Sequence, residues 1–199
     1  MDIAIVVYDG FDELDAVGPY EVFRNAADAG ADCSVTLRTL EAADRVTASH
    51  DLRIEPDGVL GDADPDLLVV PGGGWNDRDA AGAWAEAERG TIPEIVSDLH
   101  DAGVTVAGVC TGGMLLARAG VLDGRPAVTH GGALDDLRET AAEVVDARVV
   151  DDGDVLTAGG VTSGLDLAVY LVEREFGADV AERVRTEMEY EPRGTVVRG

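Results

Sequence analysis

The chain has 199 residues, enough for one well-packed α/β domain and short for two. It contains 40 acidic and 15 basic residues, for a formal net charge of −25, and every basic residue is an arginine. A dispersed acidic surface of this size repels nucleic acid and anionic membranes, so we expect neither as a partner. Because self-repulsion destabilises such a chain unless salt screens it, we interpret the charge as adaptation to a salt-rich cytoplasm. A surface for cations or for a basic partner is the alternative, but the acids are spread along the chain rather than clustered.

No basic segment with an apolar leader precedes the first apolar run, so we expect no signal peptide and a cytoplasmic protein. The longest apolar runs, such as 3–8 and 67–71, have the length of strands and are too short to span a membrane. The two cysteines and three histidines lack the spacing of metal ligands, so we expect neither a metal site nor a disulfide. Cys33 has no glycine elbow around it and is interpreted as a core residue.

Short apolar runs alternate with helical patterns along the chain. The predicted strands are 3–8, 34–40, a β excursion over 46–60 that turns near 50–51, 66–71, 104–109 and a hairpin over 148–158. The predicted helices are 18–29 after a loop over 9–17, 80–102 with interruptions near 90 and 93, 112–119, 162–176 and 178–189. This alternation predicts one flavodoxin-like α/β sandwich over 1–199, with its core at about 2–192. Its sheet is mostly parallel and carries helices on both faces.

The strongest chemical signal is the Gly-x-Cys-x-Gly pattern around Cys110, between a predicted strand and a predicted helix. This is the thiol form of a nucleophile elbow, in which small flanking residues allow a tight turn. We expect the following helix N-terminus to lower the pKa of the thiol, and the N–H of Thr111 to stabilise an anion on the substrate. The alternative is a buried structural cysteine in a glycine-rich turn.

Two further strand ends carry unusual residues, and ligands in such sheets bind beyond the carboxyl ends of the strands. Asp15 lies in the first predicted loop and could donate and accept protons, but the residues alone do not distinguish it from the nearby Asp9, Asp12 and Glu13. Three consecutive glycines at 72–74 let backbone N–H groups face a ligand, which is typical of half an oxyanion hole or of a flexible loop entry.

Taken together, these segments resemble the ThiJ/PfpI (DJ-one) superfamily, which has a class I glutamine amidotransferase-like fold. The resemblance covers about 3–192, and the order of its motifs is most similar to the isonitrile hydratase branch. The segments that carry it are Leu14-Asp15, Gly18-Pro19-Tyr20-Glu21-Val22, Val70-Pro71-Gly72-Gly73, Val109-Cys110-Thr111-Gly112, Thr129-His130, 156–166 and 189–192.

The resemblance implies a role for each matching position. Cys110 matches the nucleophile, Asp15 the acid that contacts it, and Thr111 the residue that hydratases keep beside the cysteine. Gly73 and Gly74 match a backbone oxyanion loop. Val161 and Thr162 match positions that line the pocket. Several branches of the family hold a histidine near the pocket at the position of His130. The resemblance also implies a homodimer with the active site near its interface, a small-molecule substrate and no cofactor.

Two departures limit the assignment. PfpI-type peptidases have histidine after the nucleophile, whereas this chain has Thr111, so that protease pair is absent. Hydratases tend to have tryptophan after the Thr-His pair, whereas Gly131 follows here and would reshape the pocket wall. An isonitrile hydratase-like enzyme is the expected function. The alternatives are a glyoxalase- or deglycase-like enzyme acting on small dicarbonyls, which usually has Glu where this chain has Asp15, and a stand-alone redox sensor or chaperone that uses Cys110.

Overall fold

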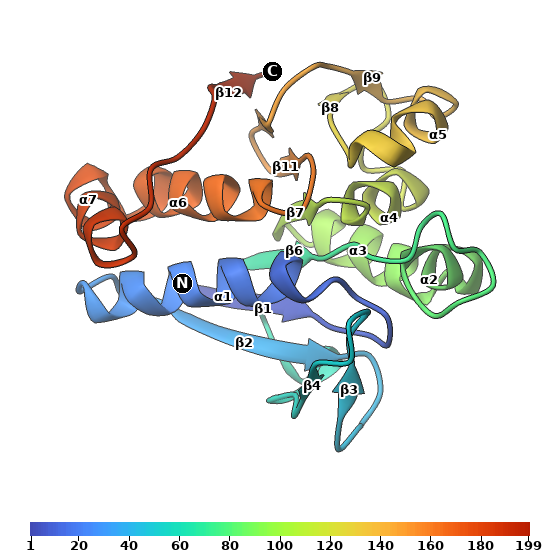
Figure 1. The fold of residues 1–199 in the computed structure, drawn as a ribbon, viewed down its shortest axis with the longest axis horizontal. Coiled ribbons are helices and arrows are strands. Elements are labelled where there is room, and N and C mark those ends of the chain that lie inside the picture. The colour runs from blue at the N-terminus through green and yellow to red at the C-terminus, as the bar shows by residue number, and fades with distance from the viewer.

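An eight-stranded sheet forms the centre of the computed structural model, which describes all 199 residues (Figure 1). Its strand order is β12-β10-β11-β7-β6-β1-β2-β5, and only β10 and β11 pair antiparallel. The expectation of a mostly parallel sheet is therefore confirmed. The strands of this sheet are β1 (Asp2–Val6), β2 (Ser34–Thr39), β5 (Gly58–Val59), β6 (Leu67–Val70), β7 (Thr105–Val109), β10 (Val149–Asp152), β11 (Val155–Ala158) and β12 (Val196–Arg198).

Helices cover the sheet in two groups (Figure 1). The chain crosses from β1 to β2 in one direction and from β6 to β7 in the other, and right-handed crossovers then put the connecting helices on opposite faces. One group is α1 (Glu13–Asp28), α6 (Ser163–Phe176) and α7 (Ala178–Glu187), and the other is α2 (Ala83–Arg89), α3 (Thr91–Asp101) and α4 (Gly112–Arg118). The reversal of direction opens a crevice at the carboxyl ends of β1, β6 and β7.

The central strands are buried on both faces, which explains their continuous apolar sequences. All four residues of β6 are buried, as are all four of β11. Phe11 and Phe23 fill the space between β1 and α1 with fully buried rings. The rigid centre of the sheet therefore holds the strand ends that carry the unusual residues. No helix in the structure is both long enough and apolar enough to cross a membrane.

Helix α1 begins five residues earlier than the sequence pattern predicts. Asp12 caps it, because its carboxylate accepts a hydrogen bond from the N–H of Leu14 at 3.1 Å. The Gly18-Pro19 pair does not open the helix but lies inside it. A Cβ on Gly18 would approach the side chain of Leu165 on α6 to 3.2 Å, so glycine here permits close packing of the two helices. Asp15 consequently lies on a helix rather than in a loop.

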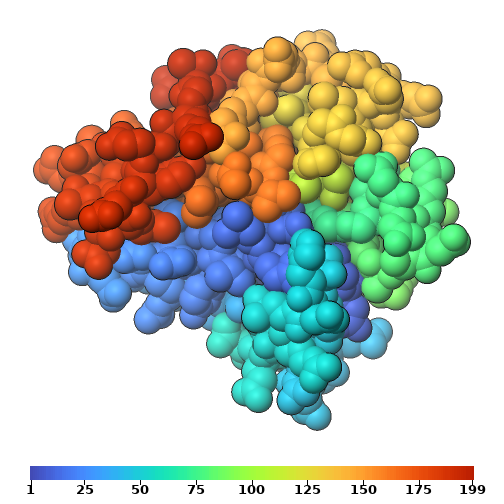
Figure 2. Space-filling model, viewed as in Figure 1, coloured from blue at the N-terminus to red at the C-terminus, as the bar shows by residue number.

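Several short elements were not predicted from the sequence. The β excursion resolves into the hairpin β3 (Val46–Thr47) and β4 (Arg53–Ile54), followed by β5 and a short 3-10 turn at Leu60–Asp62. The segment at about 40–60, cyan in the space-filling view, projects from the body of the molecule as a lobe (Figure 2). A small unit follows α4 in the chain and consists of β8 (Pro126–Ala127), α5 (Leu134–Arg138) and β9 (Glu143–Val144). Its two strands pair in parallel. Strand β12 lies beyond residue 192 and pairs with β10.

Candidate active site

Cys110 occupies a strained turn directly after β7. Its φ is +57°, a left-handed conformation that few non-glycine residues adopt, and only two other non-glycine residues of the chain have a positive φ. The neighbouring glycines make the turn possible, since a Cβ on Gly112 would lie 1.9 Å from the carbonyl oxygen of Val70. A Cβ on Gly108 would lie 2.8 Å from the backbone nitrogen of Gly113. The predicted elbow is therefore present in the structure.

Hydrogen bonds hold the strained residue from both sides. The N–H of Cys110 donates to the carbonyl of Ala158 on β11 at 3.1 Å. Its carbonyl accepts a hydrogen bond from the hydroxyl of Thr129 at 2.8 Å. Because the backbone is fixed on both sides of the thiol, the sulfur has one well-defined position at the end of the sheet.

Asp15, in the first turn of α1, is completely buried. One carboxylate oxygen, Oδ2, accepts a hydrogen bond from the N–H of Gly72 at 3.0 Å, whereas Oδ1 has no partner in the chain. Burial first and the charge of Asp12 second raise the pKa of Asp15 to about 8, although hydrogen bonds with Gly72 and Cys110 act to lower it. At neutral pH the carboxyl group therefore carries a proton, and its side chain interacts with the thiol of Cys110.

The pKa of the Cys110 thiol is raised in the structure, whereas the sequence pattern predicts a lowered pKa. Burial raises the pKa of Cys110 well above its ordinary value, and an ionised Asp15 raises it further. The N–H of Thr111 lowers the pKa of the thiol, but the cost of burying the thiolate outweighs this effect. The expected lowering at the start of α4 is therefore present, but burial of the sulfur sets the direction of the net shift. The thiol keeps its proton until a reaction removes it.

The glycine loop is tied to the elbow. The N–H of Gly73 donates to the hydroxyl of Thr111 at 2.9 Å, so this predicted oxyanion donor is already occupied. The N–H of Gly74 makes no hydrogen bond within the chain and is available to a ligand. The φ angles of +116° at Gly73 and +68° at Gly74 explain why glycines occupy these positions. The Thr111 side chain thus braces the loop while its N–H acts on the sulfur.

A pocket of about 250 Å³ opens over the thiol. It brings Cys110 and Thr111 together with four more of the predicted residues, Gly73, Gly74, His130 and Val161. The remaining lining residues are Asp12, Trp75, Asn76 and Asp77. Asp15 does not line the pocket. Thr162 does not line it either. This residue is exposed, and its hydroxyl accepts a hydrogen bond from Arg148 at 2.9 Å.

His130 is part of the pocket wall and not a partner of the thiol. Its Nδ1 accepts a hydrogen bond from the N–H of Gly132 at 3.0 Å, which fixes the ring at the start of a 3-10 turn (Gly131–Ala133). Trp75 closes another side of the pocket, with its indole N–H bonded to Asp136 at 2.6 Å and its ring edge-on to Trp84. No sequence pattern distinguishes Asn76 or Asp77 apart from their position after the glycines.

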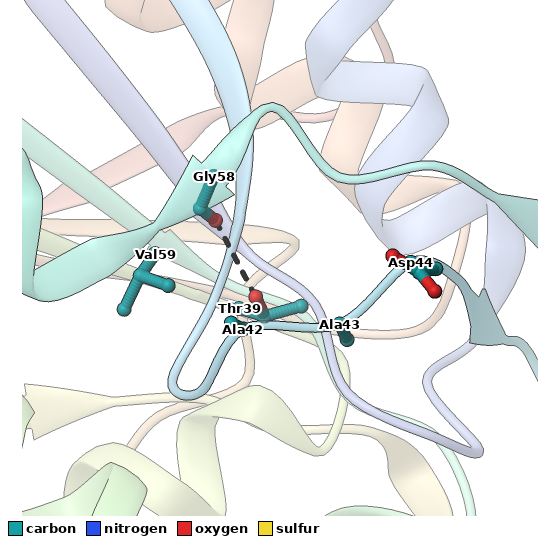
Figure 3. Close-up of a pocket in the computed structure, with 6 residues that line it drawn as sticks. All are labelled: Thr39, Ala42, Ala43, Asp44, Gly58 and Val59. Carbon is teal, nitrogen blue, oxygen red and sulfur yellow. Dashed lines mark hydrogen bonds between the residues drawn. The ribbon is translucent and has the colours of Figure 1, made fainter.

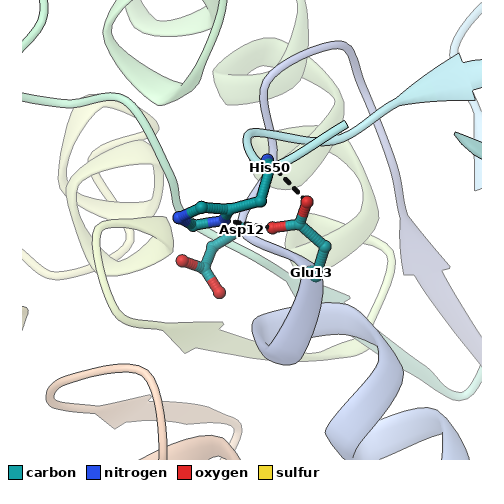
Figure 4. A group of neighbouring side chains, drawn as sticks. All are labelled: Asp12, Glu13 and His50. Carbon is teal, nitrogen blue, oxygen red and sulfur yellow. Dashed lines mark hydrogen bonds and ion pairs between the residues drawn. The ribbon is translucent and has the colours of Figure 1, made fainter. Parts of the chain in front are cut away.

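Asp12, Glu13 and His50 form a cluster near the mouth of the pocket (Figure 4). Their ligand atoms all lie within 4.8 Å of one another, so these residues could hold a metal ion. In the structure, however, His50 Nδ1 lies 2.7 Å from Glu13 Oε2, and this contact raises the pKa of His50. Burial raises the pKa of Glu13, but hydrogen bonds from the His50 ring, from two backbone N–H groups and from Ser49 outweigh it and lower the pKa to about 2. A bound cation would have to displace that contact.

A second depression lies at the ends of β2 and β5, away from the thiol (Figure 3). It measures about 280 Å³, and the hydroxyl of Thr39 donates a hydrogen bond of 3.4 Å across it to Gly58. Its lining contains one ionisable residue, Asp44, and no thiol or imidazole. This depression therefore lacks the thiol that characterises the Cys110 pocket.

Known proteins have a similar fold and a related sequence. Residues 1–174 match the DJ-1/PfpI family. The chain is 34% identical over 193 residues to an isonitrile hydratase of Pseudomonas putida, covering 96% of this chain and 79% of that protein. It is 28% identical over 157 residues to the deglycase TK1284 of Thermococcus kodakarensis, covering 77% of this chain and 87% of that protein. A ThiJ/PfpI family protein from Pseudomonas syringae has a similar crystal structure, with a TM-score of 0.82, 29% identity and coverage of 96% of this chain and 76% of that one. Sequence, fold and elbow agree, and the chain belongs to the DJ-1/PfpI family.

Proposed function

We propose that this protein is a cofactor-independent enzyme that adds water to an isonitrile to give an N-substituted formamide, with Cys110 as the nucleophile. The observation that carries the proposal is the buried pair of Cys110 and Asp15. A carboxyl group with a pKa of about 8 still holds its proton at neutral pH and can donate it to a substrate carbon. The 34% identity to an isonitrile hydratase over nearly the whole chain supports this choice of substrate.

The first half of the reaction adds the thiol across the isonitrile carbon. The sulfur of Cys110 forms a bond to that carbon, and Asp15 gives its proton to the same carbon, so that a thioimidate forms. The proton of the thiol passes to the carboxylate of Asp15, which restores the acid. This order suits a thiol with a raised pKa, because no free thiolate is needed before the attack.

Water completes the reaction. Asp15 assists the attack of a water molecule on the thioimidate carbon, and the nitrogen takes up a proton. The C–S bond then breaks, the formamide leaves and the sulfur regains its proton. The N–H of Gly74, which has no partner in the chain, stabilises negative charge that develops on the substrate. One isonitrile and one water are consumed for each formamide, and the enzyme returns to its starting state.

A small dicarbonyl is the second candidate substrate, and the deglycase relative supports it. The thiol would add to the aldehyde carbon to form a hemithioacetal, and Asp15 would move the proton during rearrangement to a hydroxy acid. The pocket of about 250 Å³ suits a small substrate of either kind. A stand-alone sensor or chaperone that uses Cys110 without turnover is the third possibility.

One assay separates these functions. The purified protein is incubated in molar KCl with an alkyl isonitrile and, in parallel, with methylglyoxal, and the products are followed by NMR. We expect formamide production that is lost in Cys110→Ser and in Asp15→Asn. Hydroxy acid without formamide would move the assignment to the dicarbonyl, and no turnover of either compound would favour the sensor or the chaperone.

We also propose that the protein is a homodimer in a salt-rich cytoplasm. Leu14 and Leu52 are the large apolar side chains that remain exposed, at 37% and 41%, and both line an open depression beside the Cys110 pocket. Val161 lines both the depression and the pocket. An apolar patch in this position supports a dimer interface near the active site.

A further inference from the structure

Tyr8 is a buried tyrosine below the active site that the proposed reaction does not use. It follows β1, is only 6% exposed, and packs edge-on against Phe11. Its hydroxyl donates a hydrogen bond to the carbonyl of Pro71 at 2.7 Å, and the carbonyl of Gly72 lies farther away at 3.2 Å. Because a phenol has one proton to donate, the nearer carbonyl is the main acceptor.

The acceptor carbonyl belongs to the peptide unit that holds Asp15. The C=O of Pro71 and the N–H of Gly72 are the two ends of one planar group. That N–H donates to Oδ2 of Asp15 at 3.0 Å. A hydrogen bond to the carbonyl of a peptide polarises it and strengthens the bond that its N–H donates. The tyrosine hydroxyl and the Asp15 carboxyl are therefore linked through a single peptide group.

We propose that Tyr8 is a positioning residue for the chemistry at Cys110: its hydroxyl fixes and polarises the Pro71–Gly72 peptide, which holds and tunes the Asp15 carboxyl. The effect on turnover rests on the proposed function, whereas the effect on Asp15 needs no substrate. The peptide has little freedom to move, since a Cβ on Gly72 would lie 2.4 Å from the backbone nitrogen of Thr111. A loosened peptide would therefore disturb both the acid and the elbow.

The charges around the pair make this one bond important. Asp15 faces Asp12 and Cys110, and Tyr8 faces Glu86 from α2 as well as these three groups. No arginine is among the groups that act on Asp15. Two hydrogen bonds lower the pKa of Asp15 and so favour its ionised form. The N–H of Gly72 has the larger effect, and the thiol of Cys110 has the smaller one. A weaker bond from Gly72 consequently disfavours ionisation of Asp15.

The test is a titration of the Asp15 side-chain carboxyl by carbon-13 NMR, with the signal assigned by its loss in Asp15→Asn. In Tyr8→Phe, which keeps the ring, we expect the midpoint to rise by about half a pH unit. Replacing Tyr8 by 3-fluorotyrosine, whose phenol is a stronger donor, should move the midpoint downward. Tyr20→Phe is the matched control, because Tyr20 lies on α1 and its hydroxyl makes no hydrogen bond; its midpoint should equal that of the unaltered protein.

Turnover gives the second measurement. In Tyr8→Phe we expect kcat for the isonitrile to fall by about 3- to 10-fold with KM within about twofold, because the acid is misplaced while the pocket is unchanged. A midpoint that stays constant in both Tyr8 variants would overturn the proposal, even if the variants melt at a lower temperature. If the unaltered protein turns over no isonitrile, the proposed function fails, and the titration alone decides the role of Tyr8.

Discussion

Replacement of Asp15 by asparagine should change how the stability of the protein depends on pH. The unaltered carboxyl has an ordinary pKa of 3.8 in the unfolded chain and a pKa of about 8 in the folded one. Between these two values the folded protein holds a proton that the unfolded chain has released. Stability linked to Asp15 is therefore fully present below pH 4 and is lost as the pH rises toward 8.

The size of the effect follows from this interval. At about 1.4 kcal/mol per pH unit, the interval from 3.8 to about 8 sets an upper limit of about 6 kcal/mol at and above pH 8. Asparagine does not titrate, so its stability does not decrease as the pH rises. Its amide nitrogen would take the place of Oδ1, which has no hydrogen-bond partner, and this unsatisfied donor costs about 1–2 kcal/mol at every pH. At pH 4 the carboxyl has lost only about 0.6 kcal/mol of this stability, so we expect Asp15→Asn to be less stable than the unaltered protein at pH 4, to match it near pH 5 and to be more stable at pH 8.5.

Urea unfolding at fixed molar KCl, from pH 4 to pH 9, measures this directly. The fluorescence of Trp75 and Trp84 reports the transition, since Trp75 is buried in the native state. Asp135→Asn is the control, because the Asp135 side chain is 97% exposed, and its curve should run parallel to that of the unaltered protein. The two curves for Asp15 should cross. If the Asp15→Asn curve runs parallel to that of the unaltered protein, the carboxyl does not hold its proton on folding, and the proton-donor role proposed for it fails as well.

Four further predictions test other parts of the structure. Thr111→Val should lower the free energy of unfolding by about 1–2 kcal/mol, because the N–H of Gly73 loses its acceptor; Thr111→Ser, which keeps the hydroxyl, should restore it. Gly112→Ala should cost about 3 kcal/mol in urea unfolding through its clash with a backbone carbonyl, whereas Gly61→Ala, with open space around it, should cost less than about 1 kcal/mol. Leu52→Asp should convert the proposed dimer to a monomer in analytical ultracentrifugation, and an unchanged mass would move the interface elsewhere. The Tm should rise between 0.1 M and 2 M KCl, since salt screens a net charge of −25, and a flat profile would contradict the salt-adaptation interpretation.

The sequence predicted the central sheet and the elbow well, because both depend on local patterns. The apolar run that becomes β7 and the glycines around Cys110 are adjacent in the chain, so their geometry can be derived without tertiary contacts. The start of α1 was missed for the opposite reason. The Gly18-Pro19 pair imitates a helix start, and its actual role, close packing against α6, depends on a residue almost 150 positions away.

The protonation of Asp15 and the hydrogen bonding of the glycine loop also could not be predicted from local sequence. Family resemblance selected Asp15 from four nearby acids, but its protonation follows from complete burial, which no local pattern encodes. Similarly, the glycines at 72–74 indicated an oxyanion loop, yet which N–H is free depends on the Thr111 hydroxyl reaching Gly73. Short motifs therefore identify which residues form this site. Contacts between strand ends that are far apart in the sequence determine the protonation and the hydrogen bonds of those residues.

The raised pKa values of the thiol and the acid determine the kind of chemistry that this site can perform. A site with a free thiolate and an ionised carboxylate would place two negative charges together in a buried region where no arginine acts on either group. With both groups protonated, the pair is neutral at rest and moves a proton only when a substrate accepts it. Such a site favours substrates whose reacting atom takes up a proton as the sulfur attacks, as the terminal carbon of an isonitrile does. In the proposed reaction the buried acid therefore matters as much as Cys110, and any change that ionises Asp15 before the substrate binds should reduce turnover.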